Sequence, residues 1–190
     1  MDVSMLHRRA VESWVRRLDA VAEDQWESPT PCAEWNVREL VNHVVGEERW
    51  TVPLLQGSTV EDVGDELDGD LLEGDPARAG RAAAQESAAL VDEKAPAGGK
   101  VSLSYGQEDV AEYVYQLAAD HLIHGWDLAA ATGGDTELDP DLVGEVGAWF
   151  AEREERYRAG GAVGPRVTST GGSQADLLAG FGRAADWAPR

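Results

Sequence analysis

The chain has 190 residues, a hydrophobic fraction of 43% and a formal charge of -20, from 36 acidic and 16 basic side chains. That hydrophobic fraction is typical of a folded domain, so the acidity does not indicate disorder. Nucleic acid and anionic membrane surfaces are excluded as partners, because both need clustered basic side chains and lysine occurs only at Lys94 and Lys100. The single cysteine, Cys32, excludes a disulfide framework and a multi-cysteine zinc site.

The length predicts a single domain over residues 1–190. No run approaches the roughly 18 apolar residues of a membrane span, and the first residues lack the pattern of a signal peptide. We therefore expect a cytoplasmic protein.

Local signals define the first half of the chain. Apolar residues at helical spacing predict an amphipathic helix over 6–21, with Ser4 as its N-cap. Two prolines in the segment 28–32 predict a loop. Asn36 and Glu39 form a capping-box pair that starts a second helix, which ends near Pro53.

The middle of the chain begins with an acidic, glycine-rich stretch over 58–75, which predicts an exposed loop. A calcium loop is excluded there, because Gly64 would stand where an acidic ligand is required. Asp75 and Pro76 then cap and begin an alanine-rich helix that runs to about Lys94. The short alternation over 101–105 predicts an extended connector or one small hairpin.

Apolar spacing predicts a long helix from Val110 to about Gly133 and another that starts at Asp139. The C-terminal extension, 160–190, is expected to be loop-like, with a short helix over 175–181. Four or five helices with almost no strand signal predict an all-α fold, an antiparallel four-helix bundle with short extra elements and little or no β structure.

The long fourth helix carries a carboxylate and an imidazole four residues apart, Asp120 and His124. This spacing places both side chains on one helix face, where they can bind one divalent metal or form a plain hydrogen bond. Asp127 falls in the same sector and is expected to orient a ligand rather than to bind the metal. His121 has a less suitable spacing and is interpreted as a packing residue or as an outer partner of the ligands.

A third donor comes from the second helix, where His43 lies within the apolar stripe. Taken alone, His43 is interpreted as a hydrogen-bonded core residue. With Asp120 and His124 it completes three protein ligands, which is the composition of a catalytic metal site with open positions. His7, between basic neighbours in the first helix, is expected to be exposed.

Two blocks of the sequence resemble the DinB/YfiT-like superfamily, in the branch related to mycothiol-dependent maleylpyruvate isomerase. The first block is Pro29-Thr30-Pro31-Cys32-x-x-Trp35-x-Val37-Arg38-x-Leu40-x-x-His43-Val44. The second block is His124-Gly125-Trp126-Asp127-Leu128-Ala129-x-Ala131-Thr132-Gly133. The ending Leu177-Leu178-Ala179-x-x-Gly182-Arg183-x-x-x-Trp187 is also similar to that of short members.

The resemblance implies a helical bundle that holds a divalent metal. Zinc is the expected metal and nickel is the alternative. It places the ligands at His43, Asp120 and His124, where the isomerase has Glu at the position of Asp120. The chain is too short for the isomerase's separate C-terminal domain, so maleylpyruvate isomerisation is not expected to transfer.

The same resemblance implies a thiol-dependent transferase or isomerase that uses mycothiol or a similar thiol together with an electrophilic substrate. An open metal site would activate the thiol by lowering its pKa. Cys32 is an alternative nucleophile, although its Pro-Thr-Pro-Cys turn favours a packing role. The other class of function is a non-enzymatic metal- or ligand-binding stress-response protein of the same fold. A monomer or a homodimer is expected.

Overall fold

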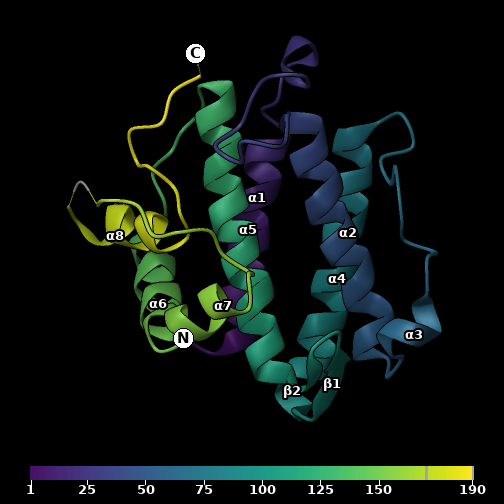
Figure 1. The fold of residues 1–190 in the computed structure, drawn as a ribbon. Helices are drawn as coiled ribbons and strands as arrows, with labels where there is room; N and C mark the ends of the chain where they lie inside the picture. The colour runs from purple at the N-terminus through teal and green to yellow at the C-terminus, as the bar shows by residue number, and fades with distance from the viewer. Residues whose placement is uncertain (170, 190) are drawn as a thin grey trace.

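The structure is a computed structural model that describes residues 1–169 and 171–189. Four long helices form its centre: α1 (Val3–Leu18), α2 (Val37–Leu55), α4 (Pro76–Lys94) and α5 (Val110–Thr132) (Figure 1). Helices α1 and α2 each pack against both α4 and α5, so the four helices close a ring around a shared core. The predicted all-α fold is confirmed.

The helix ends follow local capping chemistry. The predicted capping box is present at α2, where the Asn36 side chain accepts from the backbone of Glu39 and the Glu39 carboxylate accepts from the backbone of Asn36. Asp75 caps α4 as predicted. The N-cap prediction was wrong at α1, because the Asp2 carboxylate accepts from the Met5 amide and draws Ser4 into the first turn.

The expected antiparallel arrangement holds for two of the four neighbouring pairs. Ion pairs of Arg8 with Asp92 and of Arg81 with Asp19 show that α1 and α4 run in opposite directions. Helices α1 and α5 run parallel, as do α2 and α4 (Figure 1). The reason is the connection over 56–75, which carries the chain back along the bundle before α4 begins.

That connection is less exposed than the acidic composition suggests. It contains a short helix, α3 (Val60–Val63), and Leu71 and Leu72 are buried. Asn42 of α2 anchors it, since its Oδ1 accepts from the amide of Leu71 at 2.8 Å and its Nδ2 donates to the carbonyl of Gly69 at 2.9 Å. The predicted loop is therefore fastened to the bundle at one end.

A small hairpin joins α4 to α5, which is one of the two alternatives predicted for this stretch. Strands β1 (Lys100–Leu103) and β2 (Gly106–Asp109) pair antiparallel, with Lys100 opposite Asp109. Two 3-10 turns, Glu23–Gln25 and Ala95–Ala97, complete the connections. Among the described residues, no helix combines the length and apolarity needed to cross a membrane.

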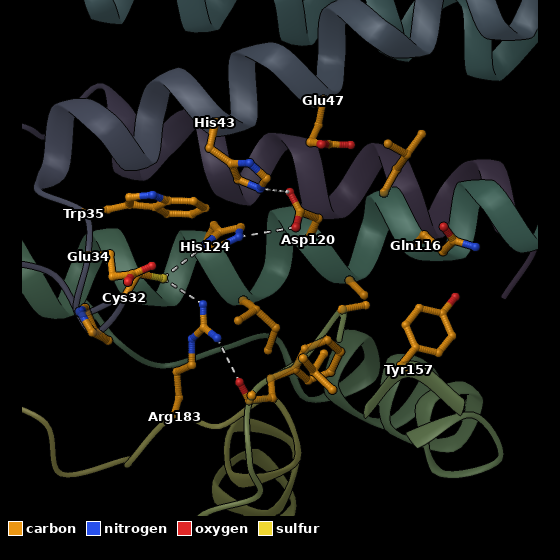
Figure 2. Close-up of a pocket in the computed structure, with 18 of the residues that line it drawn as sticks. Cys32, Glu34, Trp35, His43, Glu47, Gln116, Asp120, His124, Tyr157 and Arg183 are labelled. Atoms are coloured by element: carbon orange, nitrogen blue, oxygen red, sulfur yellow. Dashed lines mark hydrogen bonds and ion pairs between the residues drawn. The ribbon is translucent and has the colours of Figure 1, made fainter. Parts of the chain in front are cut away.

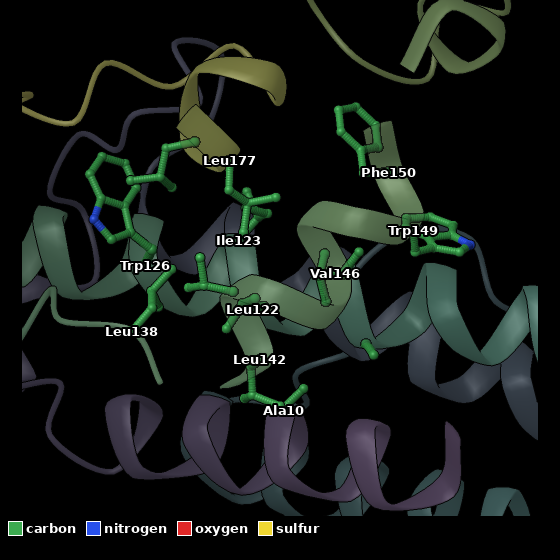
Figure 3. Packing of buried hydrophobic residues seen from close by; sticks show 14 of the residues in the cluster. Ala10, Leu122, Ile123, Trp126, Leu138, Leu142, Val146, Trp149, Phe150 and Leu177 are labelled. Carbon is green, nitrogen blue, oxygen red and sulfur yellow. The ribbon is translucent and has the colours of Figure 1, made fainter. Parts of the chain in front are cut away.

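Three further helices cover the outer face of α5: α6 (Pro140–Ala151), α7 (Glu154–Ala159) and α8 (Ser173–Gly180). Asp139, at which a helix was predicted to start, is the N-cap of α6. Helix α8 begins two residues before the predicted range, and α7 was not predicted. Their apolar side chains pack on Leu122, Ile123 and Trp126 of α5 (Figure 3). The parts of the predicted extension at residues 170 and 190 lie outside the described residues.

A group of buried polar side chains crosses the ring of helices, with one residue from each of the four long helices. We term it the core polar cluster. It consists of His7, Glu48, Ser87 and His121. The Glu48 carboxylate accepts from the Ser87 hydroxyl and pairs with Nε2 of His121. The prediction of an exposed His7 was wrong: its side chain is buried and its ring lies edge-on to that of His121, with centroids 5.4 Å apart.

Candidate metal centre

A pocket of about 670 Å³ opens between α2 and α5 on one side and the C-terminal helices on the other (Figure 2). The predicted ligands His43, Asp120 and His124 all line it. His43 projects from α2 toward Asp120 and His124 of α5, because the two helices run antiparallel and bring these positions opposite each other. The structure therefore brings together the three residues that the sequence selected.

The donor atoms of these residues are close enough to share one ion. The His43 Nε2 lies 3.7 Å from one carboxylate oxygen of Asp120, and the His124 Nε2 lies 3.3 Å from the other. One donor atom from each residue can be chosen so that all lie within 4.8 Å of one another. Ligands about 2.0–2.2 Å from a zinc ion stand at comparable separations. We call this group the metal centre.

Asp120 carries the clearest sign that a cation is expected. Its Oδ2 is buried and has no hydrogen-bond partner among the described residues. Burial alone would raise the pKa of Asp120, but the charges of His124 and His43 outweigh it and hold that pKa well below its usual range. A charged carboxylate with one oxygen that accepts no hydrogen bond fits a metal ion, because a buried charged oxygen needs a donor or a cation beside it.

Asp127 and Arg183 fix the orientation of His124. The fully buried Asp127 has its Oδ2 3.0 Å from Nδ1 of His124, which leaves Nε2 facing Asp120. Arg183 donates from Nη2 to the same carboxylate oxygen at 2.9 Å. Burial lowers the pKa of His124, but Asp120 and Asp127 outweigh it and raise that pKa well above its usual value. Asp127 therefore contacts His124, the residue that the sequence predicts it to orient, and its role toward a metal stays a prediction.

His121 lies outside the metal centre. Its Nε2 pairs with Glu48 and its Nδ1 lies 2.6 Å from the carbonyl oxygen of Leu117, so both ring nitrogens are engaged in the core. Burial lowers the pKa of His121, but the Glu48 carboxylate outweighs it and raises the pKa overall. Of the two interpretations of His121, the structure matches the packing residue.

Several pocket residues carried no predicted role. Arg183 reaches the site from the segment after α8, 56 residues after its partner Asp127. A contact over this distance in the chain cannot be predicted from a local sequence pattern. Glu47 follows His43 by one helical turn, so the same spacing that joins Asp120 to His124 could have indicated it. Trp35 packs its ring against that of His43, with centroids 4.6 Å apart.

Cys32 is half-buried and belongs to the pocket as well as to the core. Its Sγ lies 3.3 Å from Oδ2 of Asp127 and accepts from Nη2 of Arg183 at 2.8 Å. Cys32, Asp127 and His124 form a second set of donor atoms close enough for one ion. Arg183 already neutralises this set, so a cation is better accommodated at Asp120.

Comparisons with known proteins identify the family of this chain. Residues 7–129 match the family described as mycothiol maleylpyruvate isomerase N-terminal domain. Two proteins of Mycobacterium tuberculosis, named uncharacterized protein MT0763 in strain CDC 1551 and uncharacterized protein Rv0738 in strain H37Rv, are each 35% identical over 185 residues, which is 93% of this chain and 87% of theirs. No solved structure matches at a significant level. With its helical fold and its family match, the chain belongs to the mycothiol maleylpyruvate isomerase N-terminal domain family.

Proposed function

We propose that this protein binds a divalent cation, zinc or alternatively nickel, through His43, Asp120 and His124 and uses it to activate a thiol of the mycothiol type. The thiol would then be transferred to an electrophilic small molecule in the cytoplasm. The observation that carries the proposal is the buried, unpartnered Oδ2 of Asp120, set between two imidazoles at the wall of an open pocket. Family membership supports the choice of thiol.

The proposed ligand set leaves coordination positions free. Three protein ligands are typical of catalytic metal sites, in which the remaining positions accept water or substrate. A cation held there would lower the pKa of a bound thiol, so that a thiolate is available near neutral pH. The pocket of about 670 Å³ lies within the range of small-molecule sites, which leaves room for a thiol and an acceptor.

The surrounding side chains have separate roles in this proposal. Asp127 holds the His124 ring in place through Nδ1, and Arg183 holds Asp127. Trp35 covers the imidazoles of His43 and His124 and keeps water from that side. Glu47 is the proposed acceptor of the thiol proton, because its carboxylate lines the pocket one helical turn after His43, and burial raises its pKa.

The test is consumption of mycothiol by the zinc-loaded protein in the presence of an electrophile, above the uncatalysed rate. We expect activity in the wild type and its loss in His43→Ala and His124→Ala. His7→Phe is the matched control, since it also removes a histidine but lies in the core polar cluster. Zinc binding with no thiol consumption for any electrophile would contradict the transferase and support the non-enzymatic binding protein.

The role of Glu47 is tested separately. Glu47→Gln keeps the shape of the side chain but cannot accept a proton. We expect turnover to fall roughly 100-fold, the lower end of general-base contributions, while zinc content stays at the wild-type level. Unchanged turnover would remove Glu47 from the mechanism without affecting the metal centre.

A further inference from the structure

The pocket continues beyond the metal centre into a region lined by large apolar side chains. We define this region as the aromatic compartment, formed by Leu117, Ile123, Trp149, Tyr157, Val163 and Phe181. Figure 2 shows Tyr157 at the opposite end of the pocket from Trp35 and Cys32. A molecule that reaches the metal centre therefore has space for an apolar group in this compartment.

Most of the compartment comes from the C-terminal elements, which lie beyond the residues that match the family. The ring of Phe181 stacks on Phe150 with centroids 4.0 Å apart, and Trp149 stacks on Tyr115 at 5.7 Å. Trp149 also meets Tyr157 edge-on at 5.6 Å. These contacts fix the positions of the rings, so the compartment is preformed. Its shape is determined mainly by residues that follow the segment matched by the family.

The charged side chains of the pocket disfavour an anionic group in the aromatic compartment. Its lining carries the carboxylates of Glu34, Glu47 and Asp120, and Arg183 is its one Arg or Lys among the described residues. The guanidinium of Arg183 is already engaged, because Nε and Nη2 donate to Asp127 and Nη1 donates to the Phe181 carbonyl. A substrate carboxylate placed in the aromatic compartment, away from the metal centre, would therefore have no free cationic side chain as a partner, which is costly.

One polar group faces the compartment without a partner. The Tyr157 hydroxyl is buried and lacks a hydrogen bond among the described residues, and it points toward Gln116 and the pocket interior in Figure 2. A phenol in this position can donate to a neutral acceptor such as a carbonyl oxygen. In a mostly apolar pocket, a small number of polar groups fix the orientation of a ligand.

We infer that the aromatic compartment selects the electrophile, and that the preferred acceptor is an uncharged molecule with an aromatic or similarly bulky apolar group. This inference rests on the proposed thiol transfer for its chemistry. With an α,β-unsaturated ketone, the thiolate sulfur forms a bond to the β-carbon and the displaced π electrons move to the carbonyl oxygen as an enolate. The α-carbon then takes the proton that the thiol released, and no leaving group or oxidant is needed.

Ligand selection can be measured without any reaction. The saturated ketone 4-phenyl-2-butanone cannot accept a thiol, and its 4-carboxyphenyl counterpart differs by one negative charge. We expect the neutral ketone to bind the zinc-loaded protein at least about tenfold more tightly, measured by quenching of tryptophan fluorescence or by calorimetry. Equal or tighter binding of the carboxylate, or no binding of either ketone, would overturn the inference.

A charge placed in the compartment should reverse this preference. Val163 lines the pocket on an irregular segment, so Val163→Lys supplies the missing cation. Thr168→Lys adds the same charge to the same segment at an exposed position outside the pocket lining and is the matched control. We expect only Val163→Lys to favour the carboxylated ketone, and an equal effect of both variants would overturn the inference.

The Tyr157 hydroxyl is tested with Tyr157→Phe, which keeps the ring. We expect about fivefold weaker binding of 4-phenyl-2-butanone, as for the loss of one neutral hydrogen bond. Catalysis is then measured with 4-phenyl-3-buten-2-one and its carboxylated analogue, each relative to its uncatalysed addition. Selective ketone binding without thiol addition would contradict the proposed function and keep the compartment, whereas thiol addition without a preference for the neutral enone would do the reverse.

Discussion

Helix α5 places neighbouring residues into two polar clusters with opposite properties. Asp120 and His124 face a pocket, and one oxygen of Asp120 has no hydrogen-bond partner among the described residues. His121 faces the core, where both of its ring nitrogens are engaged and its partner Glu48 also holds Ser87. The two clusters share helices and residue types but differ in access to the pocket. In the core polar cluster Glu48 links Ser87 and His121, while Nε2 of His7 is enclosed in the core without a hydrogen-bond partner among the described residues.

The difference separates a site for a ligand from a structural contact. Buried polar side chains that satisfy one another, as Glu48, Ser87 and His121 do, stabilise one arrangement of the helices. A carboxylate that is held charged beside an open pocket, with an oxygen unpartnered, instead indicates a cation that is not part of the chain. Each prediction below tests whether the two clusters differ in this way.

The largest effect is expected at the metal centre. His124→Ala removes one of three donors and the hydrogen bond to Asp127, so stoichiometric zinc binding should be lost. Calorimetry or elemental analysis of the purified variant measures this, with circular dichroism to show that the helices remain. Retention of one tightly bound zinc ion would show that His124 is not a ligand.

The core polar cluster should respond in stability instead. Glu48→Ala leaves His121 without its buried partner, because both side chains are about 1% exposed. We expect the free energy of unfolding to fall by about 3–5 kcal/mol, measured with urea, while the folded protein still binds zinc. A parallel loss of zinc affinity would join the two clusters into one site.

The double variant Glu48→Leu with His121→Leu sharpens this result. Replacing a buried ion pair by apolar side chains is often neutral or stabilising. Most of the lost stability should therefore return, which a second urea titration checks. No recovery would mean that Ser87 and His7 need a polar partner at the centre of the ring.

An intermediate effect is expected from Asp127, which contacts a ligand without binding the ion. Asp127→Asn should weaken zinc binding by about 10–100-fold, the usual contribution of such hydrogen-bond partners. Asp139→Asn is the matched control, because Asp139 is an ion-paired aspartate at the start of α6, outside the pocket lining. Equal zinc affinities for the two variants would remove the outer role of Asp127.

The smallest effect concerns the pH dependence of stability. Burial, together with the neighbouring His121, lowers the pKa of His7 well below its usual value. Below about pH 6.5 the unfolded chain therefore binds a proton that the folded protein does not, so this residue reduces stability as the pH falls. His7→Phe should make the loss of stability less steep by up to about 1.4 kcal/mol per pH unit, measured by urea unfolding between pH 6.5 and 5. Identical slopes would mean that His7 is protonated in the core.

The sequence predicts the local features of this protein well. The capping residues of α2 and α4 and the spacing of Asp120 and His124 are short-range signals, and each is found in the structure. Features that depend on the path of the chain were not predictable. The parallel pairs follow from the connection over 56–75, and Arg183 meets Asp127 only because the C-terminal elements fold back over α5.

His7 shows a different limit. Its basic neighbours Arg8 and Arg9 suggested an exposed turn, yet Leu6 and Ala10 define a buried face that includes His7. Helical periodicity determines which residues share a face, but it does not determine which polar residue is tolerated at the edge of that face. In the structure the His7 ring packs edge-on against His121 of another helix, a contact that no local pattern predicts.

The central claim is that the metal centre has an open position that takes a thiol. Cobalt(II) can replace zinc as a coloured probe, and binding of sulfur adds a charge-transfer band to its absorption spectrum. The measurement uses Cys32→Ala, because Cys32 is the only sulfur of the chain in the pocket lining among the described residues. We predict that mycothiol produces this band in cobalt-loaded Cys32→Ala protein and that His43→Ala abolishes it. A cobalt spectrum that does not change on addition of the thiol would contradict the account.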